Sequence, residues 1–154
     1  AWSKPQAMAS TSAAMADRIP DGTLVIEDSV RGSGLHQIEY VGSWQHSLAN
    51  ALTGGTNSYT NMPGDTATLR FHGSGIRVYV VTQHNQGIFG FLLDSCPERT
   101  FDCRSPERRR EVLAFEATGL PAGPHVLVMR CTGEKSPEST FFWVSLDRVE
   151  VLPG

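Results

Sequence analysis

The chain has 154 residues and a formal net charge of −3, from 13 basic and 16 acidic side chains. This length suits one domain with a full hydrophobic core, so a fold that depends on disulfides or metals for its stability is excluded. The slight acidity gives no basic field for nonspecific binding to nucleic acid or to an anionic membrane. The sequence also contains no apolar run of about 18 residues that would span a bilayer.

The 15 glycines and 9 prolines, at only 19% charged residues, are typical of a turn-rich β protein. Residues 1–22 are small and polar and end in a Pro-Asp-Gly turn. They lack the basic start and continuous apolar segment of a signal peptide, so we interpret them as a linker or an N-terminal tail before a domain at residues 23–154.

From residue 23 onward, β-branched and aromatic runs alternate with turn residues, which predicts an all-β sandwich or barrel. About eight antiparallel strands are expected, at residues 23–30, 36–43, 66–72, 75–82, 87–95, 111–117, 124–132 and 140–151. The clearest hairpin covers residues 66–82, because apolar and polar residues alternate on both sides of a His-Gly-Ser-Gly turn. Its second strand turns Ile and Val side chains to one face and Arg77 and Tyr79 to the other.

Two stretches do not fit the strand pattern and are expected to be long loops, at residues 45–65 and 95–110. Cys96 and Cys103 enclose a short polar segment of the second loop, a spacing that is compatible with a disulfide. Cys131 lies in an apolar alternation and is expected to be a buried free thiol. One bridge with one core thiol suggests an exported protein.

The second loop also carries the basic run RSPERRR at residues 104–110, which is either a phosphate- or nucleic-acid-binding patch or a solvated stretch beside acidic residues. The acidic residues Glu27, Asp28, Asp147 and Glu150 lie near the two terminal strands, where they are either calcium ligands or solvated carboxylates. The five histidines form no zinc-ligand pattern. The sequence has no G-x-S-x-G elbow and no Gly-rich phosphate loop, so it shows no catalytic constellation.

Several segments, in order along the chain, resemble the galactose-binding-domain-like jelly rolls. These segments are IEYVGSW at 38–44, GGTNSYT at 54–60, GDTATLRFHGSGIRVYV at 64–80, NQGIFGFLLD at 85–94, FEATGLPAGPHVLVMRCTGE at 115–134 and VSLDRVEV at 144–151. Domains of this kind are discoidin-type β-sandwiches found as carbohydrate-binding modules and as non-catalytic domains of carbohydrate esterases. The resemblance implies a single jelly-roll β-sandwich without enzyme chemistry of its own, and a structural calcium ion at Glu27 and Asp147.

In such domains, an aromatic ring in the loops at one end of the sandwich stacks on a sugar, and polar side chains bind its hydroxyls. The resemblance makes Trp44 and Tyr59 candidate platforms, although Trp44 has a core residue as its alternative. The candidate polar partners are His46, Asn57, His84 and Asn85, together with Gln86. Arg77 and Tyr79 offer a second candidate surface on the face of the sheet.

The expected function is therefore noncovalent carbohydrate binding by a secreted or cell-surface protein, with an oligosaccharide or polysaccharide as partner. The chain is then a module of a larger glycan-active or surface protein. Two alternatives remain open. The same loops and the Arg77/Tyr79 face would contact a protein in an adhesion domain, or the chain would be a non-catalytic accessory domain of a carbohydrate esterase or glycosidase.

Overall fold

The computed structural model describes residues 16–47 and 56–154. Residues 1–15 of the predicted tail and 48–55 of the first predicted loop lie outside the described residues. The described residues form strands and turns and contain no α-helix. No helix that is long and apolar enough to cross a membrane was found among them.

Twelve strands are present in the described part of the chain. They are β2 (Asp17–Arg18), β3 (Leu24–Glu27), β4 (Ile38–Val41), β5 (Gln45–His46), β6 (Ser58–Thr60), β7 (Thr66–Gly73), β8 (Gly75–Thr82), β9 (Ile88–Leu93), β10 (Arg99–Asp102), β11 (Arg109–Ala117), β12 (Gly123–Cys131) and β13 (Val144–Leu152). All eight predicted strands form, as β3, β4, β7, β8, β9, β11, β12 and β13. The additional strands β2, β5, β6 and β10 have two to four residues each.

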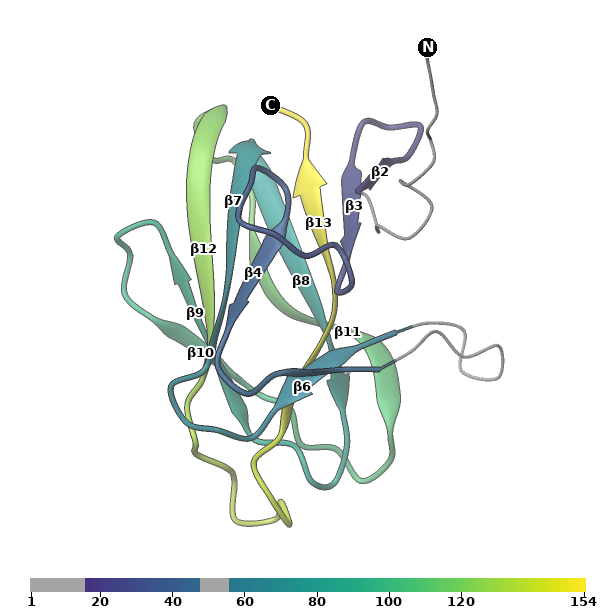
Figure 1. The fold of residues 1–154 in the computed structure, drawn as a ribbon, viewed down its shortest axis with the longest axis vertical. Helices are drawn as coiled ribbons and strands as arrows, with labels where there is room; N and C mark the ends of the chain where they lie inside the picture. Colours follow the sequence, from purple (N-terminus) through teal and green to yellow (C-terminus); the bar gives the residue numbers. More distant parts are fainter. Residues whose placement is uncertain (1–15, 48–55) are drawn as a thin grey trace.

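The strands build two antiparallel sheets that lie face to face (Figure 1). One sheet has the order β10-β9-β12-β7-β4, and the other has the order β11-β8-β13-β3-β2, with β6 paired to both β13 and β5. The predicted all-β jelly-roll sandwich is therefore confirmed.

The core lies between the sheets, and the predicted alternation holds in β7, β8 and β12. Ile76, Val78 and Val80 of β8 are fully buried, whereas Arg77 and Tyr79 lie on the outer face of the same strand. Burying a branched or aromatic side chain of this kind contributes about 1.5–3 kcal/mol each. These residues hold the second sheet against the first, and they leave its outer face free for polar chemistry.

The end of the predicted tail belongs to the sheet. Asp17 and Arg18 of β2 pair with Val25 and Leu24 of β3, and the Asp21 carboxylate accepts a hydrogen bond of 2.8 Å from the backbone N–H of Thr23. The prediction that this segment is a linker concerns mainly residues outside the described part and stays untested.

The structure does not contain the predicted disulfide between Cys96 and Cys103. All three cysteines are free: Cys96 is exposed in the loop between β9 and β10, whereas the Cys103 side chain is buried in the core. Burial raises the pKa of the Cys103 thiol strongly. The two side chains therefore face different environments, which the sequence spacing alone does not reveal. Cys131 is buried, as predicted.

Candidate functional site

A polar pocket of about 320 Å³ lies on the second sheet, where β6 and β13 pair and the chain leaves β8. Its lining residues are Ser47, Asn57, Tyr59, Val81, Gln83, Asn85, Gln86, Arg108, Trp143 and Ser145. Three predicted binding residues, Asn57, Tyr59 and Asn85, come together here, and Gln86 joins them. The volume is within the range of small-molecule sites.

Strand pairing places the aromatic wall of the pocket. Tyr59 of β6 is opposite Ser145 of β13, so both side chains are on the same face of the sheet. The Tyr59 ring meets the Trp143 ring edge to face, with 5.5 Å between the ring centroids. The Trp143 backbone is fixed on both sides, because its N–H donates to the Asn85 carbonyl at 3.2 Å and its carbonyl accepts from the Gly87 N–H at 2.6 Å.

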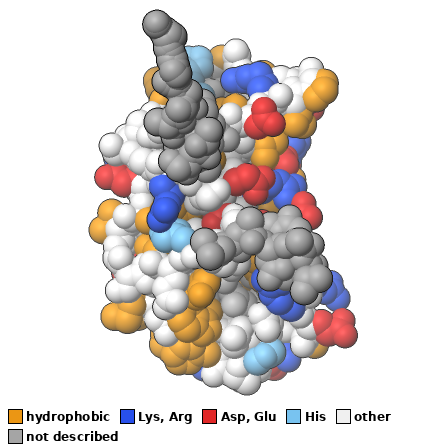
Figure 2. Space-filling model, turned by 45° about the vertical axis from the view of Figure 1, so that its right-hand side comes forward, with side chains coloured by type: hydrophobic (Ala, Val, Ile, Leu, Met, Phe, Trp, Pro, Cys, Tyr) orange, Lys and Arg blue, Asp and Glu red, His pale blue; other side chains and the backbone are white. Residues whose placement is uncertain are grey.

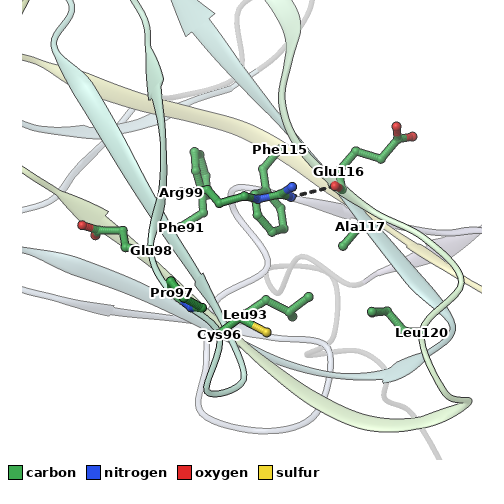
Figure 3. A pocket seen from close by; sticks show the side chains of 10 residues that line it. All are labelled: Phe91, Leu93, Cys96, Pro97, Glu98, Arg99, Phe115, Glu116, Ala117 and Leu120. Carbon is green, nitrogen blue, oxygen red and sulfur yellow. Dashed lines mark hydrogen bonds between the residues drawn. The ribbon is translucent and has the colours of Figure 1, made fainter.

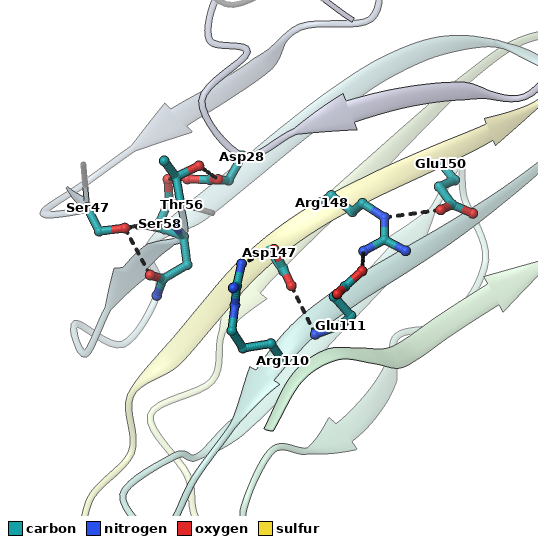
Figure 4. Close-up of polar contacts among 10 residues, drawn as sticks. Asp28, Ser47, Thr56, Ser58, Arg110, Glu111, Asp147, Arg148 and Glu150 are labelled. Carbon is teal, nitrogen blue, oxygen red and sulfur yellow. Dashed lines mark hydrogen bonds and ion pairs between the residues drawn. The ribbon is translucent and has the colours of Figure 1, made fainter. Parts of the chain in front are cut away.

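A buried carboxylate anchors β6, which carries Tyr59 (Figure 4). Asp28 is 1% exposed, and its side chain accepts hydrogen bonds from the hydroxyls of Thr56 and Ser58, at 2.6 Å from Ser58. Its backbone carbonyl accepts a bond of 2.7 Å from the Tyr40 hydroxyl. Burial raises the pKa of Asp28, and the two hydroxyl donors partly offset that effect. The polar strand β6 is thus held by hydrogen bonds rather than by apolar packing.

Hydrogen bonds within the protein also determine which amide atoms in the pocket remain available to a ligand. Ser47 donates to Oδ1 of Asn57 at 2.9 Å, and Gln86 donates to Oδ1 of Asn85 at 3.2 Å. Ser145 in turn donates to Oε1 of Gln86 at 3.1 Å. The Nδ2 groups of Asn57 and Asn85 have no acceptor among the residues described. The pocket therefore offers fixed hydrogen-bond donors beside an aromatic wall.

Six lining residues were not among the binding residues expected from the sequence: Ser47, Val81, Gln83, Arg108, Trp143 and Ser145. Arg108 comes from the second predicted loop, which the chain fastens to the end of β8: the Gln83 N–H donates to the Cys103 carbonyl at 3.1 Å, and the Ser105 N–H donates to the Gln83 carbonyl at 3.2 Å. This contact joins segments about twenty residues apart in the sequence, so no local sequence pattern predicts it.

The other loop candidates do not line the pocket. Trp44 is 9% exposed and belongs to the core, where its indole N–H donates to the Thr66 carbonyl at 3.0 Å. The His46 ring bonds the Ser58 hydroxyl at 2.7 Å, and burial lowers its pKa. His84 is exposed, with its ring 3.2 Å from the Thr140 hydroxyl. The core alternative for Trp44 is the one that the structure adopts.

The second candidate surface is a network of ion pairs. Arg77 pairs with Glu116 at 2.7 Å, and Arg148 lies over the Tyr79 ring, 4.1 Å from its centroid. Arg148 also pairs with Glu150 at 3.1 Å. The pKa of Tyr79 is raised by burial and then by the neighbouring Glu150. Arg77 and Tyr79 are thus engaged by their neighbours on the sheet.

The predicted calcium ligands lie near each other on neighbouring strands, but they fit a calcium ion poorly. Asp147 is 3% exposed, and its carboxylate accepts a bond of 2.9 Å from the Glu111 N–H and lies 3.9 Å from the Arg110 guanidinium. Burial raises the pKa of Asp147. The pKa of Glu27 is also raised, first by burial and then by the negative charge of the nearby Asp147. Within residues 16–47 and 56–154, no group of three or more His, Cys, Asp or Glu side chains is arranged to hold a metal. Figure 4 shows Asp147 directed at its protein donors.

A second cavity, of about 470 Å³, opens where the edge strands β10 and β11 face each other (Figure 3). Phe91, Leu93 and Phe115 form much of its wall. The Arg99 guanidinium lies 4.2 Å from the centroid of the Phe115 ring and donates to the Glu116 carbonyl at 2.8 Å. Arg99 therefore bridges the two sheet edges at the rim of an apolar cleft.

The polar pocket continues into a row of aromatic rings in the segment before β13. The Trp143 centroid lies 5.9 Å from that of Phe141, which is 4.3 Å from that of Phe142. Phe141 is 36% exposed. This segment is at the lower end of the molecule in Figure 1, and hydrophobic side chains gather on the surface at the lower end of the space-filling view (Figure 2).

In sequence comparisons, no protein-family model and no curated protein matches this chain. The fold is similar to several solved structures. A two-domain esterase active on acetylated mannans matches with a TM-score of 0.63 and 14% identity over 86% of this chain. A family two carbohydrate esterase from Cellvibrio japonicus matches with a TM-score of 0.55 and 13% identity over 91%. A GH26-CBM35 β-(1,4)-mannanase from Podospora anserina matches with a TM-score of 0.53 and 13% identity over 87%.

The match covers 36%, 35% and 28% of these three chains, so this chain spans about a third of each of them. At these identities the likeness concerns the fold. The domain therefore has the galactose-binding-domain-like β-sandwich fold that its sequence segments resemble.

Proposed function

We propose that this domain is a non-catalytic carbohydrate-binding module whose ligand lies in the polar pocket. The observation that carries the proposal is the combination of the Tyr59 and Trp143 rings with the fixed amides of Asn57 and Asn85 in one concave site. A sugar presents an apolar C–H face and a ring of hydroxyls, and these two kinds of group match the two kinds of wall.

The lining of the pocket supports binding without catalysis. Its described lining contains no Asp, Glu, His or Cys side chain, so no carboxylate, imidazole or thiol reaches a ligand there. Its two serine hydroxyls donate to Asn57 and Gln86 and have no activating base. A ligand in this pocket would be bound and released unchanged.

The neighbours in the structural comparison support a place in a larger protein. Each of the three is an enzyme named for a carbohydrate substrate or class, and this fold makes up about a third of its chain. We infer that the domain is a module of such a glycan-active protein. We also infer that this protein acts outside the cell, where insoluble or polymeric polysaccharides are found.

A glycan array with the intact domain and with Tyr59→Ala tests the proposal. We expect binding to an oligosaccharide that falls by about tenfold or more in Tyr59→Ala, because the variant removes one aromatic wall. Tyr79→Ala is the matched control, since it makes the same change on the same sheet face outside the pocket. Equal binding by Tyr59→Ala and loss in Tyr79→Ala would move the site to the ion-pair network. A blank array with a recovered protein partner would favour the adhesion alternative.

The same array, run with calcium and with EDTA, tests the implied calcium ion. We expect no difference in binding or in Tm, because the Asp147 carboxylate already has donors from Glu111 and Arg110. A rise of Tm in calcium that is lost in Asp147→Asn would instead establish a calcium site at these terminal strands.

A further inference from the structure

We propose that the sugar held in the polar pocket is acidic: a hexuronate, or another sugar with a carboxylate, whose negative charge is bound by Arg108. This inference rests on the proposed function, because it uses the same pocket. It goes further by naming the class of carbohydrate.

Arg108 has no ion-pair partner in the described part of the chain. Among the described residues, no carboxylate lies within ion-pair distance of its guanidinium. Five arginines on the sheets do have a carboxylate partner, whereas Arg18 of β2, Arg99 of β10 and Arg109 of β11 have none among these residues. Those pairs are Arg70 with Glu39, Arg77 with Glu116, Arg110 with Asp147, Arg130 with Glu98 and Arg148 with Glu111. Residues 1–15 and 48–55 contain no Asp or Glu that would supply one.

The charge in the pocket is positive. Arg108 is the charged residue among its ten lining residues, so the site carries a positive charge on a chain whose formal net charge is −3. Opposite charge in a concave, partly desolvated site favours an anionic ligand and steers its approach. A neutral sugar would leave this cation unused.

The neutral amides of the pocket present hydrogen-bond donors. Ser47 and Gln86 occupy the Oδ1 atoms of Asn57 and Asn85, which leaves the Nδ2 donors of both amides for a ligand. A pocket with an excess of donors matches a ligand with an excess of acceptors. A carboxylate has only acceptors, and it meets a guanidinium through two parallel hydrogen bonds.

Arg108 is also placed so that it does little for the fold. It is exposed, and it lies in the short segment that precedes β11. Its neighbour Arg109 is exposed too, but it begins β11 opposite Thr82 and does not line the pocket. The chain therefore provides its own control: two adjacent exposed arginines, of which one faces the pocket.

The test uses oligosaccharides in matched pairs. Oligogalacturonate, oligoguluronate and glucuronoxylan fragments are each compared with the same compound after its carboxyl groups have been reduced to alcohols. Binding is measured by isothermal titration calorimetry with the intact domain, Arg108→Gln, Arg108→Lys and Arg109→Gln. We expect at least one acid form to bind about tenfold more tightly than its reduced form, the factor that one charge-assisted pair of hydrogen bonds supplies.

In Arg108→Gln this preference should disappear, while Arg109→Gln should keep it. Arg108→Lys should keep only part, since an ammonium cannot form the two parallel bonds. The preference should also shrink at 1 M salt. Equal binding of acid and reduced forms, or a preference that survives in Arg108→Gln, would overturn this inference and leave the proposed function in place. No binding of any oligosaccharide, including the neutral ones on the array, would overturn both.

Discussion

Replacing Trp44 by alanine should destabilise the domain strongly, because the side chain is part of the core and not of the sugar site. The indole is 9% exposed and contacts the core through two rings, with centroid distances of 5.1 Å to Tyr40 and 6.4 Å to Phe89. Its N–H donates to the Thr66 carbonyl at 3.0 Å.

The expected loss in the free energy of unfolding combines two terms. Truncating a buried Trp to Ala removes apolar contacts and leaves a cavity, which together cost about 3–5 kcal/mol. The lost hydrogen bond contributes about 1 kcal/mol. The Trp44→Phe variant measures this contribution separately, because it removes the hydrogen bond but keeps most of the ring volume. We therefore expect about 4–6 kcal/mol for Trp44→Ala and about 1–2 kcal/mol for Trp44→Phe.

Urea unfolding followed by far-UV circular dichroism measures both values, since removing a tryptophan alters the fluorescence signal. At about 2–4 °C per kcal/mol for a domain of this size, Trp44→Ala should also lower Tm by roughly 10 °C or more. The matched control is Tyr59→Ala, which should cost about 1–2 kcal/mol at its half-buried position. A Trp44→Ala variant that is as stable as the intact domain but has lost its glycan ligand would refute the reasoning and return Trp44 to the binding site.

Three further predictions follow from single contacts. Asp28→Ala should lower the free energy of unfolding by about 2–3 kcal/mol and weaken ligand binding without touching the pocket, because Ser58 loses its acceptor; unchanged binding in calorimetry would contradict this. Both His125 ring nitrogens face acceptors, at 2.8 Å from Asp94 and 2.7 Å from a backbone carbonyl, and the Asp94 bond raises the pKa of His125. The stability difference between the intact domain and His125→Gln should thus be fully present below pH 6.5 and be lost as the pH rises through the higher folded-state pKa; a difference that grows with pH would argue against a protonated ring. Finally, a thiol reagent should label Cys96 alone in the native domain and all three cysteines after unfolding; a native domain with no reactive thiol would indicate a disulfide.

The strands with a strong apolar alternation were predictable from the sequence. In β8 every second residue is a branched aliphatic side chain, and burial against the opposite sheet follows that pattern. The short strand β6 was not predictable in this way. Its buried Ser58 and Thr60 side chains donate hydrogen bonds to Asp28 and Asp65, respectively. These partners do not recur at a regular spacing along the sequence, so no periodic pattern indicates a strand here.

The candidate site shows the same division. Tyr59, Asn57 and Asn85 were selected because aromatic and amide residues in loops suit a sugar, and the structure brings all three to one pocket. Arg108 lies in the basic run for which the sequence left both a binding patch and a solvated stretch open, because its place depends on a pairing between Gln83 and Arg104 that no local pattern records. The predicted disulfide at Cys96 was wrong for a related reason, since spacing does not say which way a side chain points.

The most direct test of the central claim is a titration that follows the tryptophan indole N–H signals by NMR. The chain has three tryptophans, of which Trp143 lines the pocket and Trp44 lies in the core. During titration with an oligosaccharide identified on the array, the Trp143 signal should shift and saturate while the Trp44 signal stays in place. A shift of Trp44 with no change at Trp143, or saturable binding that moves neither signal, would contradict a sugar site in this pocket.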